Sequence, residues 1–425
     1  MRSRQVRASL LEIRVFGIEL GSIGWLLAMS TMLFVLLFPF SSYVAALPII
    51  QEEWGLNNTQ AGAIFSAYLA GFAVSALVVV PLTDRLGSKR VFVASTSISV
   101  VANVLFPLVA NDAITASILR ALAGLGLVGV YNPGMRIVAE RFADRGRGFA
   151  VGTFVTFFYA SNSVSLTLTG ILLAWFEWRD AYLIMSAASG ASVVMAFLVL
   201  RNHKSQSVSG SSGRLDISVL KNKAARIYIT GYSLHAAELY IVRVWLPALL
   251  AAALIARGED ELNAAVGAAT IGGLAMASGA IGPVMGGTMS DRFGRAASAS
   301  VIFVLSGVCA VAVGWMVGLP LPLIIGVSIV LGWAIAADSA IYSTAVTEVA
   351  EPTRLGSTMA VHSFVGFMGG VVGPVLAGAV LDVSPESLKW GLTFSATGLL
   401  AIVAIIAMRG MWRLPTMPSP GSSSD

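Results

Sequence analysis

The chain is organised into apolar blocks of about 20 residues, each long enough as a helix to cross about 30 Å of hydrocarbon. Hydrophobic residues make up 56% of the 425 positions and charged residues only 12%, about half the charged fraction of a soluble domain. Because lipid offers no partner for backbone polar groups, such blocks must be helices. The sequence therefore predicts an all-α polytopic membrane protein with about 12 transmembrane helices, at residues 25–49, 58–81, 91–110, 114–138, 148–175, 180–200, 224–254, 263–287, 296–317, 321–346, 357–381 and 389–409.

Basic residues are distributed unequally between the two sides of this helix array. They gather in alternate connections, whereas the opposite connections hold only Arg179, Arg257 and Lys389. By the positive-inside rule, the basic side faces the cytoplasm, and both termini lie there. The net charge of +5 thus reflects topology, and no nucleic-acid partner is expected. We expect a multi-pass protein of the cell (plasma or inner) membrane, in contact with lipid.

A short charged phrase occurs twice, about 207 residues apart. The first copy, residues 82–90, contains Asp-Arg-Leu-Gly, and the second, residues 289–295, contains Asp-Arg-Phe-Gly. Each copy lies between two apolar blocks, so each is a tight hairpin between membrane helices. Such a duplication predicts two pseudo-symmetric six-helix bundles, a construction common among transporters.

Polar segments set the expected domain boundaries. The long polar stretch between the sixth and seventh spans belongs where a linker joins two bundles. The first segment, with four arginines among apolar residues, could form an amphipathic helix on the membrane surface. The expected order is a cytoplasmic N-terminal segment at 1–24, the first bundle at 25–200, a cytoplasmic linker at 201–223, the second bundle at 224–410 and a disordered tail at 411–425.

These motifs resemble those of one transporter family. The loop signature Gly-x-Leu-x-Asp-Arg-x-Gly-Arg-Lys is matched by Leu82, Asp84, Arg85, Gly87 and Lys89, with Val80 and Ser88 departing from it. The second half supplies Gly287, Asp291, Arg292, Gly294 and Arg295, and a helix-four signature fits Arg120, Gly124 and Gly126. In these motifs the chain resembles the twelve-helix transporters of the major facilitator superfamily over nearly its whole length. The resemblance implies a transporter rather than an enzyme.

Two interpretations of the loop motifs remain open. Asp84 and Asp291 lie where helix ends and cationic side chains cluster, so each can hold an inner gate through charge-assisted hydrogen bonds. Alternatively, the charges only enforce topology and tight turns, with Gly87 and Gly294 supplying a positive φ.

Ionisable residues inside the spans are the strongest candidates for mechanism, because hydrocarbon makes each of them costly. Glu238 is the first candidate for a proton site, since burial disfavours its ionised form. His235, one turn earlier, can share or relay that proton. The alternatives are a static pair of Glu238 with Arg243 or His235, and a pair of Asp338 with a neighbouring cation.

Arginines within the spans suggest an anionic or polar substrate, since a guanidinium grips a carboxylate with two hydrogen bonds. Arg243 and Arg120 are the candidates, although Arg120 belongs to the helix-four signature and could serve proton coupling or structure instead. Polar and aromatic residues that could line the cavity are Tyr43, Asn132, Asn162, Tyr240, Trp245 and Tyr342.

The sequence favours a secondary active transporter that takes up a small polar or anionic metabolite together with H⁺, by alternating access and as a monomer. No phosphate-binding loop or metal-ligand spacing occurs in it, so neither a cofactor nor a metal is expected. Two alternatives remain: proton-driven efflux of hydrophobic compounds, and a transporter-like scaffold or assembly factor without turnover. Drug antiporters of the superfamily usually carry a Gly-Pro pattern in helix five, which this chain lacks.

Overall fold

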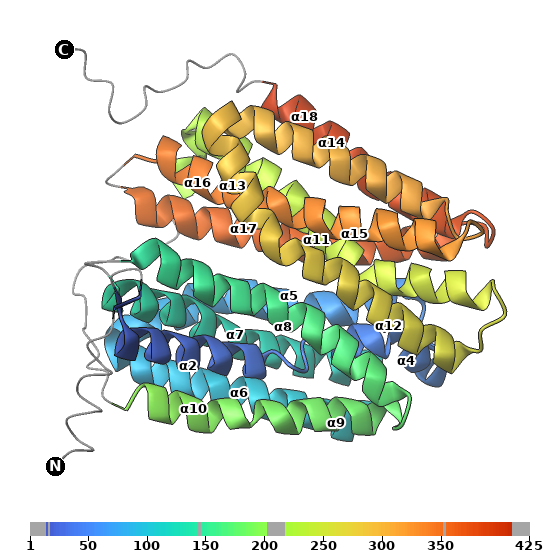
Figure 1. The fold of residues 1–425 in the computed structure, drawn as a ribbon, viewed down its shortest axis with the longest axis horizontal. Coiled ribbons are helices and arrows are strands. Elements are labelled where there is room, and N and C mark those ends of the chain that lie inside the picture. Colours follow the sequence, from blue (N-terminus) through green and yellow to red (C-terminus); the bar gives the residue numbers. More distant parts are fainter. Residues whose placement is uncertain (1–13, 16–17, 143–145, 202–216, 352–353, 410–425) are drawn as a thin grey trace.

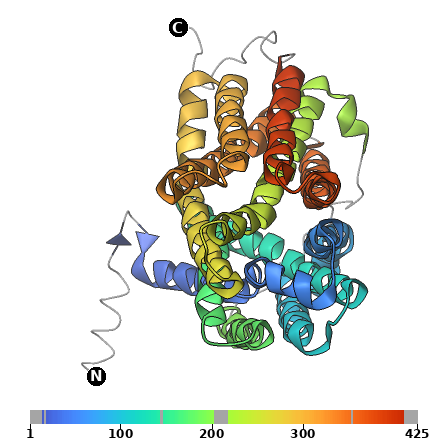
Figure 2. The same ribbon diagram turned by 90° about the vertical axis from the view of Figure 1, so that its right-hand side faces the viewer.

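A computed structural model gives the three-dimensional structure of the chain. It describes residues 14–15, 18–142, 146–201, 217–351 and 354–409, apart from the side chains of Arg14, Val15, Ile18, Glu19, Leu20, Val80, Pro81, Thr83, Asp84, Arg85 and Ser88. Two helical bundles lie against each other, the first in blue to green and the second in yellow to red (Figures 1 and 2). The prediction of an all-α, two-bundle fold is confirmed.

The first bundle follows a pair of two-residue strands, β1 (Arg14–Val15) and β2 (Ile18–Glu19). Its helices are α2 (Leu20–Leu36), α3 (Ser42–Ala45), α4 (Leu47–Trp54), α5 (Asn58–Leu86), α6 (Ser88–Val109), α7 (Ala113–Arg141), α8 (Arg147–Leu173), α9 (Trp178–Ser189) and α10 (Ala191–Val199).

The second bundle follows the short 3₁₀ helix η1 (Ile217–Lys221). Its helices are α11 (Lys223–Ile255), α12 (Glu261–Ser278), η2 (Gly279–Ile281), α13 (Gly282–Phe293), α14 (Arg295–Gly314), α15 (Leu321–Ala337), α16 (Ser339–Val349), α17 (Leu355–Val383) and α18 (Lys389–Met408). Residues 202–216 of the expected linker lie outside the described residues.

The described ranges contain 11 helical segments long and apolar enough to cross a membrane, and one shorter apolar helix, Gly21–Leu36. That shorter helix belongs to the first expected span, 25–49, which is broken between α2 and α3 rather than continuous. Pro39 lies in the break. Its backbone nitrogen carries no hydrogen to donate, and its ring disfavours a helical backbone conformation at the preceding residue.

The N-terminal segment differs from the expected amphipathic helix in the part that is described. Arg14 lies opposite Glu19 and Val15 opposite Ile18 in an antiparallel pair. Residues 1–13 and 16–17 of the expected segment lie outside the described residues.

The two bundles meet closely on the side opposite η1, here called the distal face, which carries the loops at 55–57, 256–260 and 384–388 (right in Figure 1). Small residues permit this contact. A Cβ on Gly62 would lie 2.4 Å from the backbone oxygen of Pro374, and one on Gly170 would lie 2.5 Å from the Cβ of Ala269. Helices α5 and α17 therefore pack backbone to backbone at their distal ends, and α8 packs against α12 through a glycine and an alanine.

Candidate functional site

A buried pair links α11 to the junction of α15 and α16. The Nδ1 atom of His235 lies 2.8 Å from Oδ1 of Asp338, and their side chains are 1% and 2% exposed. The contact is an ion pair by distance rather than a well-aligned hydrogen bond. Asp338 occupies the position between the two helices, and its backbone oxygen accepts from the amide of Ile341. Among the described residues, the side-chain partner of Asp338 is therefore His235.

Glu238 lies one turn further along α11 and is 1% exposed. Its Oε2 atom accepts a hydrogen bond of 3.1 Å from the hydroxyl of Ser306 on α14. Its Oε1 atom is buried without a hydrogen-bond partner in the described structure. The alternative pairs of Glu238 with Arg243 or His235 are not among the contacts of the described residues. A buried carboxyl with one open oxygen can take up or release a proton.

Arg243, on the same helix, is 7% exposed. Its guanidinium lies 5.3 Å from the ring centre of Tyr240 and 5.7 Å from that of Tyr159, which belongs to α8 of the other bundle. Its Nη1 atom is buried without a hydrogen-bond partner among the described residues. Aromatic faces attract a cation less strongly than a carboxylate does. The arrangement therefore leaves a buried cation open to an anion at the interface of the bundles.

Arg120 is held differently, inside the first bundle. Its Nη1 and Nη2 atoms lie 3.4 and 3.3 Å from the backbone oxygen of Phe40, in the break between α2 and α3. The ring of Tyr68 lies 4.6 Å from the guanidinium, and the hydroxyl of Tyr182 lies 3.4 Å from Nη1. These contacts favour the structural interpretation of Arg120, because they satisfy a backbone group that the break sets free.

A second residue supports the same break. The hydroxyl of Ser165 on α8 donates to the backbone oxygen of Phe38 and accepts a 2.9 Å bond from the amide of Ser41. Interrupted helices are a common element of transporter sites near the membrane midplane.

Three of the six predicted cavity-lining residues are committed to packing. The hydroxyl of Tyr43 donates to the oxygen of Ala61 at 2.9 Å, and Nε1 of Trp245 donates to the oxygen of Pro374 at 3.0 Å. Tyr342 is fully buried, with its hydroxyl 3.8 Å from the sulfur of Met408.

The remaining predicted lining residues are less constrained. Tyr240 packs against Phe65 across the interface, with ring centres 6.1 Å apart. Asn162 donates to the oxygen of Phe158 at 2.6 Å, while its own Oδ1 is buried without a partner among described residues. Asn132 is half-buried on α7.

Two interior residues of the site were not predicted from the sequence. His362, on α17, is 2% exposed and stacks on Tyr232 with ring centres 4.1 Å apart. Tyr159 reaches across the interface, and its hydroxyl lies 3.4 Å from that of Ser339, next to Asp338. His362 could have been found by the argument that singled out His235, because it is an ionisable residue within an apolar span.

The loop motifs form turns and local ion pairs. Gly87 and Gly294 have φ values of 85° and 87°, so their expected positive φ is confirmed. Arg295 joins Asp291 at 2.6 Å and Glu348 of α16 at 2.7 Å, all within the second bundle.

The other motif residues make lesser contacts. Lys89 donates to the backbone oxygen of Arg201, and Arg292 lies over Phe293. The side chains of Asp84 and Arg85 lie outside the described part of the structure.

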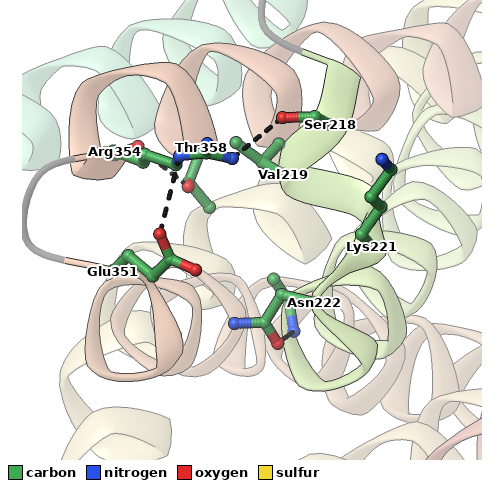
Figure 3. Close-up of a pocket in the computed structure, with 8 residues that line it drawn as sticks. Ser218, Val219, Lys221, Asn222, Glu351, Arg354 and Thr358 are labelled. Carbon is green, nitrogen blue, oxygen red and sulfur yellow. Dashed lines mark hydrogen bonds and ion pairs between the residues drawn. The ribbon is translucent and has the colours of Figure 1, made fainter.

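A pocket of about 370 Å³ lies apart from this interior, where η1 meets the start of α17 (Figure 3). Its polar groups engage one another: Nη1 of Arg354 donates to the hydroxyl of Ser218 at 2.9 Å, and the side chain of Asn222 caps the first turn of α11. Glu351 lies 3.5 Å from Arg354. The pocket therefore fastens the segment before α11 to α17, and we assign no ligand to it.

Comparison with known proteins identifies the family. The sequence pattern of the Major Facilitator Superfamily matches residues 29–319 and 228–424. A gallate transporter of Pseudomonas putida is 24% identical over 93% of this chain and 94% of its own length. A probable 4-methylmuconolactone transporter of Cupriavidus pinatubonensis is 27% identical over 89% and 87%.

Among solved structures, a mutant of the nucleoside transporter NupG superposes with a TM-score of 0.74 at 15% identity, over 92% of this chain and 100% of that one. The chain belongs to the Major Facilitator Superfamily. It is thus a multi-pass membrane transporter of a small molecule, not an enzyme.

Proposed function

We propose that the protein takes up a small organic anion together with a proton. The observation that carries this proposal is the buried guanidinium of Arg243, which has aromatic contacts but no carboxylate partner among the described residues. A buried cation without a counter-ion is costly, so binding of an anion there is favoured over binding of a neutral molecule.

The neighbouring charges favour a single anionic group as the ligand. Asp338 lies 2.8 Å from His235, and Glu238 has a hydroxyl partner. Arg243 therefore remains as the cation for the substrate, with Tyr159 contributed by the opposite bundle. The names of the similar gallate and methylmuconolactone transporters agree with a small organic acid.

Glu238 is the proposed proton site, with the His235–Asp338 pair beside it. Glu238 and His235 lie on α11 five and eight residues before Arg243, so proton and substrate would act on one helix. Rocking of the two bundles would expose this site to each side in turn. The basic linker side would face the cytoplasm of a cell membrane, with both termini inside. One chain supplies every residue of the site, so a monomer suffices.

The test is uptake into proteoliposomes under an imposed pH gradient. The panel contains gallate, other small carboxylates and their uncharged methyl esters. We expect a carboxylate, and not its ester, to move in the same direction as protons. Movement opposite to the proton gradient would indicate an exporter instead, and no movement of any compound would favour a scaffold.

The assignment of Arg243 is tested in the same assay with a matched pair of variants. Arg243→Gln should weaken binding of the transported anion about 10- to 100-fold, the effect of losing charge-assisted hydrogen bonds. Arg226→Gln removes the same charge from an exposed position on the same helix, and should leave binding unchanged. Equal affinities for wild type and Arg243→Gln would rule out the proposed role.

A further inference from the structure

One carboxylate joins the two bundles at the distal face. Asp382, in the last turn of α17, accepts four hydrogen bonds from the first turn of α5. Its Oδ1 atom accepts from the backbone and side-chain nitrogens of Asn58, both at 2.8 Å. Its Oδ2 atom accepts from the amide of Thr59 at 2.9 Å and from its hydroxyl at 2.6 Å. Both oxygens of Asp382 are thus used between bundles rather than within one.

The start of α5 needs such a partner. The first amides of a helix have no acceptor within it, and the helix dipole makes this end attractive to a negative charge. Asn57 accepts from the amide of Gln60 at 2.8 Å, and the Gln60 side chain accepts from the amide of Asn57. The amides of Asn58 and Thr59 donate instead to the carboxylate of Asp382.

The corresponding helix of the second bundle is capped differently. Helix α12 begins after Asp260, whose own side chain accepts from the amide of Asn263 at 3.0 Å. That cap belongs to the same bundle and is unaffected when bundles separate. The Asp382 contact is therefore coupled to the relative position of the bundles, and the Asp260 contact is not.

Close packing places Asp382 within reach. A Cβ on Gly378, one turn before it, would lie 2.4 Å from the backbone oxygen of Asn58. A small separation of α5 from α17 would thus break all four hydrogen bonds together. Asp382 is exposed and Asn58 is half-buried, so water can reach the carboxylate and replace these bonds when they break, and the contact can form and open repeatedly.

We propose that Asp382 sets how often the distal face opens, by holding α5 against α17 until its four hydrogen bonds are released. Asp382 is then a positioning residue for transport: it does not touch the substrate, and it shifts the balance between the closed and open distal face. This inference rests on the alternating access proposed above.

The test measures the distance between the bundles directly. Spin labels at Ile114→Cys and Leu319→Cys, two exposed distal positions in different bundles, are introduced with Cys309→Ser, which removes the natural cysteine. Pulsed spin-resonance distances are then recorded, without substrate or pH gradient, for the labelled protein with Asp382 intact and for the labelled variants Asp382→Asn and Asp382→Ala. We expect the population with the longer distance to increase about tenfold in Asp382→Ala, with Asp382→Asn between the two.

Asp260→Ala is the matched control, because it removes a similar helix cap from the same face. An unchanged distribution in Asp382→Ala would overturn the proposal. So would an equal shift in Asp260→Ala, since general loosening of helix ends would then explain both. Melting temperatures confirm that each variant is folded. A shift specific to Asp382 without transport of any anion would support this inference while contradicting the proposed substrate.

Discussion

His235 and Asp338 form an ion pair of 2.8 Å at the point where α15 ends and α16 begins. The two residues lie about 100 positions apart in the chain, on helices that the sequence treats as separate spans. Because Asp338 lies against His235, Arg243 is left without a carboxylate partner among the described residues of the second bundle. The availability of Arg243 for an anion therefore depends on this pair.

Disruption of the pair should be costly. Either Asp338→Asn or His235→Gln leaves the other group buried without its partner, and we expect each to lower the free energy of unfolding by about 3 kcal/mol. The double variant should lose less than the sum of the two. Asp291→Asn, in a pair whose carboxylate is 68% exposed, is the control and should cost under about 1 kcal/mol. Denaturant unfolding in detergent measures all four, and strictly additive losses would show that the pair contributes no interaction energy.

If Glu238 is the proton site, replacing it should abolish proton-driven accumulation of substrate without abolishing substrate exchange. Glu238→Gln keeps the size of the side chain and its hydrogen bond to Ser306, but an amide cannot bind and release a proton. We expect accumulation driven by a pH gradient to fall to background, while exchange of labelled for unlabelled substrate continues. Glu259→Gln, in the distal loop, should leave both unchanged. Undiminished accumulation in Glu238→Gln would move the proton site elsewhere, with His235 and Asp338 as the next residues to test.

The spans and the buried ionisable residues could be predicted from sequence, because hydrocarbon selects strongly for apolar length and against charge. The partners of those residues could not. Spacing along α11 makes His235 a neighbour of Glu238, yet its side chain turns to Asp338. Which helix faces which is decided by tertiary packing.

The contact of Asp382 with α5, which joins the two bundles, could not be predicted from the sequence. Asp382 follows an apolar run, where a carboxylate is unremarkable, and its partners lie 324 residues away. Pro39 could have indicated the break in the first helix, which the expected span 25–49 did not include, but nothing in the sequence shows that Ser165 and Arg120 satisfy it. Such pairings depend on the approach of helices, which hydropathy does not determine.

Arg120 should matter for stability. Arg120→Met leaves the oxygen of Phe40 buried without its donor and removes the contact with Tyr68, and we expect a loss of about 2 to 4 kcal/mol. Arg201→Met, at an exposed position after α10, should cost under about 0.5 kcal/mol. Thermal and denaturant unfolding of purified protein measures both. Lost transport at unchanged stability would instead place Arg120 in proton coupling or substrate binding.

Glu53 gives the distal face a dependence on pH. Partial burial favours a higher pKa for Glu53, but hydrogen bonds from Trp178 and Arg179 outweigh it and hold the pKa below its usual value. A lowered pKa stabilises the fold above the unfolded pKa of about 4.3, and the contribution disappears as pH falls through the folded value. Because the Glu53 side chain is 41% exposed, the effect should not exceed about 1 kcal/mol.

Melting temperatures of wild type and Glu53→Gln across pH test this. We expect the wild type to be slightly more stable at pH 7 and the difference to vanish as pH falls through the lowered pKa of Glu53. A difference that grows in acid would have the wrong sign for this contact.

Gly378 tests the close approach of α5 and α17 independently of any charge. Its added Cβ would meet the backbone oxygen of Asn58 at 2.4 Å, and a backbone atom cannot rotate away. Gly378→Ala should therefore push the helices apart, weaken the Asp382 contact and increase the open population in the same spin-label experiment. Overpacking of this kind costs about 1 to 3 kcal/mol. Gly287→Ala is the matched control, because a Cβ there meets nothing within 4 Å. A distal face that stays closed in both variants would show that the packing at Gly378 does not control opening.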